Sequence, residues 1–372
     1  MIRRITEGLI KEKLFKGKAI IIFGPRQVGK TTLLKKLFAD NPDVLWLNGD
    51  EPDIQTLFTD ITSSRLRAIT GLKKIIVIDE AQRIRDIGLK LKLITDSLPE
   101  IQLIATGSSA FELSNSVNEP LTGRKWEFNL FPLSYSELVK HHGLIEENRL
   151  LKHRLIFGYY PDVVNNFGQE KEILHLLADS YLYKDILSWE QIQKPEKLTR
   201  LLQALALQVG CQVSYNEIGQ ICNLDSKTVE KYINVLEKIY VIFRLNSFSR
   251  NIRNELKSSK KIYFYDNGIR NAVLASFNMF ESRSDVGALW ENFLMSERMK
   301  RNKYKGLWVN SYFWRTKDQK EIDYIEEADQ RISAFEFKWN ANQKVKNPTV
   351  FTETYKGDFN VVTNENYEAF LL

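Results

Sequence analysis

Short apolar runs alternate with amphipathic stretches along the first third of the chain. The apolar runs have the length and continuity of buried strands and lie at residues 19–23, 44–47, 75–78, 101–105 and 126–130. Between them, the spacing of apolar residues predicts helices over residues 32–39, 53–63 and 86–98. Because apolar strands that alternate with helices form parallel sheets covered on both faces, we predict a doubly wound α/β domain over residues 1–145.

The middle of the chain is helical in pattern. Leucines and aromatic residues recur at helical spacing over residues 146–208, and a helix, a turn, a second helix and a strand follow at residues 213–221, 223–224, 225–236 and 241–245. Asp225 or Ser226 can cap the second helix. Helix–turn–helix–strand is the outline of a winged helix. We therefore predict a helical region with a winged helix over residues 146–255 and a further α/β domain over residues 256–372.

The loop after the first predicted strand carries a phosphate-binding pattern. Residues 24–31 read Gly-Pro-Arg-Gln-Val-Gly-Lys-Thr and match GxxxxGK[ST]. Glycines let backbone N–H groups turn toward a phosphate, Lys30 neutralises phosphate oxygens, and Thr31 offers a hydroxyl to Mg²⁺. We expect ATP and Mg²⁺ as ligands. The residues predicted to bind the nucleotide are Gly24, Pro25, Arg26, Gln27, Val28, Gly29, Lys30, Thr31 and Thr32.

Polar residues end two further strands of this domain. Asp79 and Glu80 follow residues 75–78, the arrangement in which the first carboxylate supports Mg²⁺ and the second polarises the attacking water. After residues 101–105, Thr106 or Ser108 can contact the γ-phosphate or that water. Arg124 is a candidate for stabilising charge during phosphoryl transfer, in cis or from a neighbouring subunit, and a solvated loop arginine is the alternative.

Composition narrows the class of protein. With 372 residues the chain exceeds the size at which one core stops growing, so several domains are expected. It has no apolar run near the ~20 residues of a membrane helix and no secretory signal, so we expect a cytoplasmic protein without a membrane partner. The two cysteines, Cys211 and Cys222, lie apart from histidines, which argues against a zinc site and favours a reducing compartment.

The basic residues leave the class of partner open. The net charge of +6 permits contact with nucleic acid but does not demand it. In the predicted winged helix, three lysines are set against two glutamates, so DNA binding and protein docking are both alternatives. Residues 250–261 and 298–320 are rich in lysine and arginine. The second segment also contains Tyr304, Trp308, Tyr312, Phe313 and Trp314, which can stack on bases or pack in a core.

A last candidate site lies near the carboxyl end. Asp323 and, on the following predicted strand at residues 332–339, Glu336 and Lys338 share one face of a β-hairpin, because residues i and i+2 point the same way. Two acids and a lysine suit metal-assisted phosphodiester cleavage, in which the acids hold Mg²⁺. Glu291 can supply a further acid. The pattern is common by chance, so alone it favours cleavage only weakly.

Taken together, these motifs resemble one family. Residues 24–31, 75–80 and 103–109 resemble the AAA-type ATP-binding proteins of prokaryotes that carry a carboxyl-terminal domain of unknown function. The likeness continues through residues 121–124, 131–134, 158–164 and 261–268. In that family the terminal domain is similar to the PD-(D/E)XK nuclease superfamily, and the resemblance assigns Glu291, Asp323, Glu336 and Lys338 to its site. The stretch after Asn340 is short for such a fold.

We therefore expect an AAA-like ATPase domain that couples its nucleotide state to a winged-helix and nuclease-like module. Lys30, Glu80, Thr106 and Arg124 are the predicted catalytic residues, and Thr31 and Asp79 the predicted metal ligands. The alternative is a slow nucleotide-controlled switch that docks a protein partner and carries an inactive nuclease-like domain. The sequence leaves open whether DNA is bound and whether the chain forms a homo-oligomer.

Overall fold

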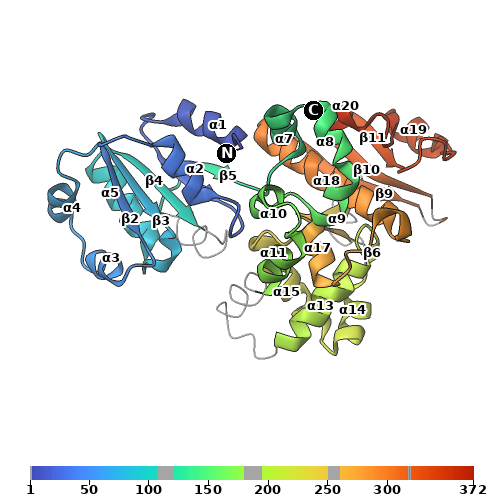
Figure 1. The fold of residues 1–372 in the computed structure, drawn as a ribbon, viewed down its shortest axis with the longest axis horizontal. Coiled ribbons are helices and arrows are strands. Elements are labelled where there is room, and N and C mark those ends of the chain that lie inside the picture. Colours follow the sequence, from blue (N-terminus) through green and yellow to red (C-terminus); the bar gives the residue numbers. More distant parts are fainter. Residues whose placement is uncertain (1, 108–119, 180–194, 250–259, 317, 319) are drawn as a thin grey trace. The chain divides into compact units, whose positions relative to one another are not determined.

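The computed structural model describes residues 2–107, 120–179, 195–249, 260–316, 318 and 320–372 (Figure 1). These residues form two compact units. The amino-terminal unit comprises Met1–Pro132 with Lys238–Tyr240, and the carboxyl-terminal unit comprises Leu133–Glu237 with Val241–Leu372. Within the described residues, no helix combines the length and the apolar character that a membrane crossing requires.

The amino-terminal unit is built on a five-stranded parallel sheet in the order β2-β3-β4-β1-β5 (Figure 1). Its strands are β1 (Ala19–Phe23), β2 (Val44–Asn48), β3 (Ile75–Asp79), β4 (Gln102–Gly107) and β5 (Lys125–Asn129). The parallel α/β prediction is confirmed. Because β4 lies between β1 and β3, the polar residues that end these three strands meet at one edge of the sheet.

The helices of this unit are α1 (Ile5–Lys13), α2 (Lys30–Leu37), α3 (Pro52–Leu57), α4 (Ser63–Thr70), the 3₁₀ turn η1 (Ala81–Arg83) and α5 (Ile87–Ser97). The prediction of one helix over residues 53–63 is wrong. The first helix ends at Leu57, the Phe58 side chain is buried, and a second helix starts at Ser63. Thr62 caps this second helix, because its hydroxyl accepts the Arg65 amide at 3.3 Å.

The carboxyl-terminal unit contains a mixed seven-stranded sheet in the order β12-β11-β10-β9-β7-β8-β6. Its strands are β6 (Gln212–Val213), β7 (Ile242–Ser247), β8 (Lys260–Phe264), β9 (Asn310–Arg315), β10 (Glu321–Ala328), β11 (Arg331–Phe337) and β12 (Asp358–Val362). The sheet takes strands from both sides of the boundary expected between residues 255 and 256. The division into three domains stays a prediction.

Helices of several lengths surround this sheet. They are α7 (Tyr135–His142), α8 (Leu144–Arg149), α9 (Leu151–Phe157), α10 (Pro161–Asn165), α11 (Glu170–Leu177), α13 (Pro195–Leu207), α14 (Tyr215–Cys222), α15 (Ser226–Lys238), α17 (Asn267–Val273), η3 (Phe280–Ser282), α18 (Val286–Tyr304), α19 (Thr349–Tyr355) and α20 (Tyr367–Leu371). The two helices and the strand predicted over residues 213–245 are confirmed as α14, α15 and β7. Asp225 starts α15 by accepting the Thr228 amide at 2.9 Å.

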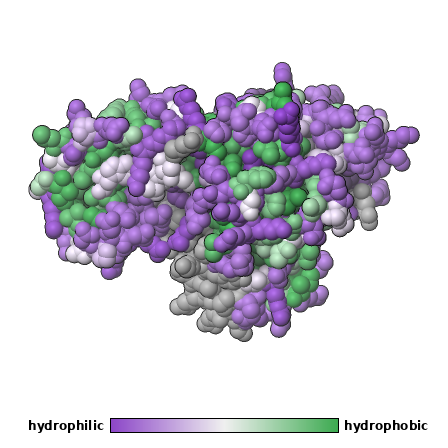
Figure 2. Space-filling view, in the orientation of Figure 1, coloured by the Kyte–Doolittle hydropathy of each residue, from purple (hydrophilic) through white to green (hydrophobic). Residues whose placement is uncertain are grey.

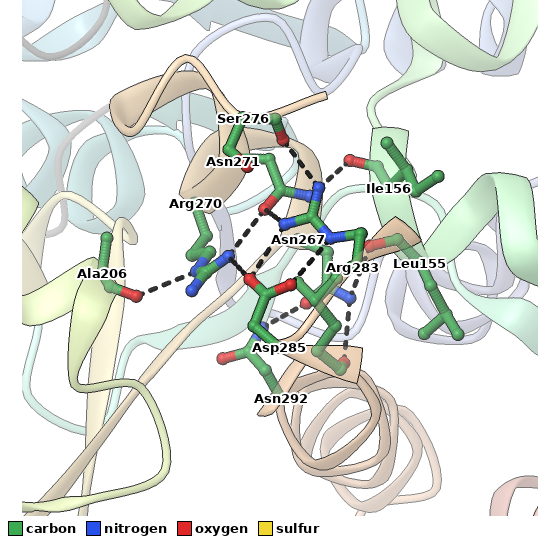
Figure 3. A network of polar contacts seen from close by, with 11 residues as sticks. Leu155, Ile156, Ala206, Asn267, Arg270, Asn271, Ser276, Arg283, Asp285 and Asn292 are labelled. Carbon is green, nitrogen blue, oxygen red and sulfur yellow. Dashed lines mark hydrogen bonds and ion pairs between the residues drawn. The ribbon is translucent and has the colours of Figure 1, made fainter. Parts of the chain in front are cut away.

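A buried polar network ties α17 to the start of α18 (Figure 3). Arg270 donates to Asp285 Oδ2 at 2.5 Å and to the Ala206 carbonyl at 2.9 Å, and Arg283 donates to Asp285 Oδ1 at 2.8 Å. Asn271 donates to the Ile156 carbonyl on α9 at 2.8 Å. These bonds join helices that are distant in sequence, so Arg270 and Asn271 have a structural role.

Most of the aromatic residues proposed for base stacking are instead packed inside. Tyr304, Phe313 and Trp314 are buried, and Tyr312 packs against the core of Phe248, Trp314, Ile322, Ile325, Ala334 and Phe351. Trp308 differs, because 96% of it is exposed. The face drawn in Figure 2 is mainly hydrophilic, with apolar residues scattered over both units. Core packing, the second of the two alternatives, therefore accounts for four of the five aromatic residues.

Candidate nucleotide site of the amino-terminal unit

The predicted phosphate loop joins β1 to α2 and depends on two glycines. A Cβ on Gly24 would lie 2.1 Å from the Leu130 carbonyl oxygen, so only glycine fits there. Gly29 is left-handed, with φ of 91°, and leads directly into α2, whose amino end faces back along the loop. Arg26 and Gln27 form the outer, more accessible part of the loop, whereas Val28 is buried. Thr32, the last residue predicted to bind nucleotide, is exposed in the first turn of α2.

Lys30 lies across the concave side of this loop. Its Nζ donates to the carbonyl oxygens of Gly24 and Pro25, both at 2.9 Å, and the residue is buried. A lysine held by loop carbonyls beside a helix amino end provides positive charge where the oxygens of a triphosphate can bind. The structure thus places Lys30 against the loop backbone, and its binding of phosphate stays a prediction.

Arg4, which was not predicted from the sequence, supports the loop through hydrogen bonds to backbone carbonyls. Its guanidinium donates to the Val28 carbonyl at 2.8 Å and to the Phe131 carbonyl at 2.6 Å, and the side chain is buried. Val28 belongs to the loop and Phe131 follows β5, so one arginine connects two backbone segments that are far apart in sequence. No local motif marks Arg4, because its partners are backbone atoms.

Thr31, Asp79 and Thr106 form one hydrogen-bonded group at the sheet edge. Thr31 Oγ1 donates to Asp79 Oδ2 at 2.6 Å, and Thr106 Oγ1 donates to Asp79 Oδ1. Hydroxyl and carboxylate oxygens are the ligands that Mg²⁺ prefers. The structure therefore brings together three of the predicted site residues, which follow or end three different strands. Their oxygen atoms are of the kind that can bind the Mg²⁺ of an ATP–Mg²⁺ complex.

Glu80 has an unusual backbone conformation. Its φ of 47° is left-handed, which is uncommon for a residue with a side chain. Its amide donates to Thr106 Oγ1 at 3.1 Å, and its carboxylate accepts a bond of 2.5 Å from Gln82 Nε2. Gly49 permits the turn, since a Cβ there would lie 2.4 Å from the Glu80 carbonyl oxygen. These contacts hold the Glu80 backbone at the end of β3 and tie its carboxylate to Gln82.

The structure does not bring Arg124 to this group. Arg124 precedes β5, and its carbonyl accepts the amide of Ala19 at the start of β1. The loop follows the other end of β1, about 13–16 Å away along a strand of this length. The guanidinium instead bonds to Asp96 at 2.8 Å on the surface. At this position Arg124 does not reach the phosphates of its own subunit. The alternative, a loop arginine exposed to solvent, fits the position. Ser108, the alternative to Thr106, lies outside the described residues.

A second polar site lies in the carboxyl-terminal unit, where the carboxylates of Glu291, Glu321, Asp323 and Glu336 form an acidic cluster. The structure brings together the residues assigned by resemblance, since Lys338 bonds to Glu336 Oε1 at 2.7 Å and Asp323 Oδ2 accepts the Phe337 amide at 2.8 Å. It adds Lys261, whose Nζ lies 2.5 Å from Glu321 Oε1 and 3.2 Å from Glu291 Oε1. A lysine directly before the apolar run Ile262-Tyr-Phe264 of β8, at a position that shares a face with Tyr263, is a signal that sequence reasoning could have used.

Burial and charge shift the pKa values of this cluster. Burial, reinforced by the Asp323 charge, raises the pKa of Glu291 to about 7, and the same two causes raise that of Glu336. Burial opposes the charge of Lys261, but the nearby carboxylates, Glu291 first, outweigh it and raise the lysine's pKa. Tyr263 donates to Glu291 Oε1 at 2.7 Å, and burial raises its pKa well above the usual value.

Three family models match successive parts of the chain. Residues 16–139 match a AAA domain, residues 148–279 a domain of unknown function (DUF8612), and residues 286–370 another domain of unknown function (DUF4143). An uncharacterized protein of Mycobacterium tuberculosis is 25% identical over 340 residues, covering 90% of this chain and 74% of its own length. An uncharacterized protein of Methanocaldococcus jannaschii is 24% identical over 340 residues, covering 85% and 74%.

Among solved structures, a Walker-type ATPase of Pyrococcus abyssi is similar to this chain. The TM-score is 0.50 with 16% sequence identity, over 74% of this chain and 96% of that one. At this identity the likeness shows a shared fold. Together with the match of residues 16–139 to a AAA domain and the parallel sheet that carries the loop, it supports a P-loop ATPase fold for the amino-terminal unit.

Proposed function

We propose that this protein binds and hydrolyses ATP at the edge of the five-stranded sheet. The observation that carries the proposal is the bonded group in which Asp79 accepts from both Thr31 and Thr106, directly beside the phosphate loop and Glu80. Lys30 and the loop amides hold the phosphates, and Thr31 and Asp79 are the side chains that would hold Mg²⁺. When bound, the metal supplies charge neutralisation for the phosphate oxygens.

Glu80 is the proposed general base. Its carboxylate can accept a proton from water, and Gln82 and the Thr106–Glu80 amide bond orient it at the strand end. Thr106 acts as a positioning residue, because it bonds to both Asp79 and the Glu80 backbone. Arg26 and Gln27, at the outer part of the loop, are proposed to border the nucleotide.

The test is phosphate release from ATP by the full chain and by Lys30→Ala. We expect release by the wild type and a loss of about 100-fold or more in the variant, since a buried lysine at the phosphates has no substitute. Lys35→Ala, on the same helix α2, is the matched control. Equal release by wild type and Lys30→Ala, or binding of nucleotide by neither, would contradict the proposal.

A second candidate is the slow switch, in which ATP is held for long periods and its γ-phosphate controls a partner surface. This alternative includes an inactive nuclease-like domain, and the ion pairs that lysines of the same unit make with the acidic cluster are the observation that supports that part of it. Affinity for ATP with negligible turnover would support the switch over continuous hydrolysis. Adding duplex DNA to the phosphate-release assay tests the partner class: stimulation supports DNA, and no response supports a protein partner.

A further inference from the structure

A buried lysine lies at the centre of the acidic cluster. We propose that the Lys261 ammonium takes the place of a divalent cation among the carboxylates of Glu291, Glu321 and Asp323, and that the carboxyl-terminal unit therefore does not cleave phosphodiesters with a metal ion. The inference concerns the carboxyl-terminal unit alone and does not depend on ATP hydrolysis.

Three carboxylates lie within ion-pair distance of the Lys261 ammonium group. Lys261 Nζ lies 2.5 Å from Glu321 Oε1, 3.2 Å from Glu291 Oε1 and 3.7 Å from Asp323 Oδ1. An ammonium group has three N–H donors and no acceptor, so it can bond to Glu321 and Glu291 while its charge also attracts the carboxylate of Asp323. Three acidic side chains that converge on one point are the usual environment of a divalent cation, and here a fixed positive charge lies at that point.

The side chain is held there by the sheet. Lys261 lies in the middle of three strands, opposite Gln212 on β6 and Leu245 on β7, and its Nζ lies 5.5 Å from the Phe313 ring centroid. Only 1% of its side chain is exposed, so solvent does not compete for the ammonium. Withdrawal of Lys261 would leave the three partly buried carboxylates without the cation that they share, which is unfavourable.

Further donors bond to the carboxylates of the cluster. Tyr263 donates to Glu291 Oε1 at 2.7 Å, and the Phe337 amide donates to Asp323 Oδ2 at 2.8 Å. Arg315 lies 3.3 Å from Glu321 Oε2, and Lys338 lies 2.7 Å from Glu336 Oε1. In the part of the chain that the structure describes, no three acidic, histidine or cysteine side chains are arranged to hold a metal ion. The residues therefore do not fit the metal that the resemblance implies.

The experiment is calorimetric titration of Mn²⁺ into the full chain without nucleotide. All proteins carry Asp79→Asn, which removes the candidate metal ligand of the amino-terminal unit. We expect no saturable binding in this background protein. Adding Lys261→Met should create one Mn²⁺ site per chain, and adding Asp323→Asn as well should abolish it. Lys260→Met is the matched control, because the neighbouring residue of β8 points to the other face of the sheet, and it should create no site.

Lys261→Gln provides a second variant should Lys261→Met fail to fold, as judged by circular dichroism, since glutamine keeps a hydrogen-bond donor without charge. Binding of one Mn²⁺ by the background protein, abolished by Asp323→Asn, would overturn the proposal without any Lys261 variant. Folded Lys261→Met or Lys261→Gln proteins that take up no Mn²⁺ would also overturn it.

Supercoiled plasmid should stay intact with wild-type protein in Mg²⁺ or Mn²⁺, and nicking that Asp323→Asn removes would contradict the proposal.

Discussion

Asp79 accepts a hydrogen bond from Thr106, which ends the neighbouring strand β4. Its second carboxylate oxygen accepts from Thr31, at the start of α2. The carboxylate is thus held from both sides by hydroxyl groups that belong to different strand–loop connections. This arrangement fixes the candidate metal ligand before any nucleotide binds, and the first prediction follows from it.

Thr106→Val should lower ATP turnover about tenfold. The substitution keeps the shape of the side chain but removes the hydroxyl that bonds to Asp79 and to the Glu80 amide, a loss of about 1 to 1.5 kcal/mol. Thr95→Val, which removes a hydroxyl bonded only to the helix carbonyl of Leu91, is the control. Steady-state phosphate release measures both, and equal rates in the two variants would count against a positioning role for Thr106.

Arg4→Met should weaken ATP binding and destabilise the amino-terminal unit. It leaves the carbonyls of Val28 and Phe131 without their buried charged donor, at a cost of about 2 to 4 kcal/mol in the free energy of unfolding. Because Val28 is part of the phosphate loop, the KM for ATP should rise at temperatures where the variant is fully folded. Exposed Arg3→Met is the control. A lower melting temperature with an unchanged KM would show that Arg4 has only a structural role.

Arg124→Ala should leave turnover within about twofold of the wild type when the protein is dilute. Arg124 lies at the opposite end of the sheet from the loop and pairs with Asp96 on the surface, where such pairs contribute about 0 to 1 kcal/mol. Phosphate release measured over a range of protein concentrations separates the alternatives. A large loss that appears only at high concentration would indicate that Arg124 acts on a neighbouring subunit.

Acid should destabilise the carboxyl-terminal unit through Glu326. Burial opposes ionisation of Glu326, but the Arg298 guanidinium and donors from Asn302 and Tyr324 outweigh it, so its pKa lies below the usual 4.5. A lowered pKa contributes stability above the unfolded value, which is lost as the pH falls below about 4.5 through the folded value. Denaturant unfolding from pH 7 to 3 should therefore show a shallower acid limb in Glu326→Gln than in the wild type. The exposed Glu353→Gln serves as the comparison, and parallel acid limbs in all three proteins would refute this assignment.

The sequence predicted the elements best where local chemistry determines them. The apolar runs at residues 19–23 and 75–78 are strands because branched apolar side chains suit a sheet buried on both faces, and the glycine pattern of residues 24–31 requires a loop. The helix predicted over residues 53–63 failed because a threonine cap competes locally with helix continuation. The sequence pattern alone does not show which of the two prevails. In the structure, α3 ends before Phe58, whose side chain is buried.

Features set by long-range contacts could not be read from the sequence. Arg4 acts on carbonyls that any residue provides, and Lys261 meets its acids only once β8 and β10 belong to one sheet. Strand order and register decide each of these points, and both depend on pairings between distant segments.

The most direct test of the account is ATP turnover by Glu80→Gln, with ATP affinity measured in parallel. Glutamine keeps the size of the side chain and a partner for Gln82 but cannot take a proton from water. We predict affinity within about threefold of the wild type and phosphate release slower by about 100-fold or more, the usual contribution of a general base. Unchanged phosphate release by Glu80→Gln, at undiminished affinity, would contradict the assignment of this sheet edge as an ATP-hydrolysing site.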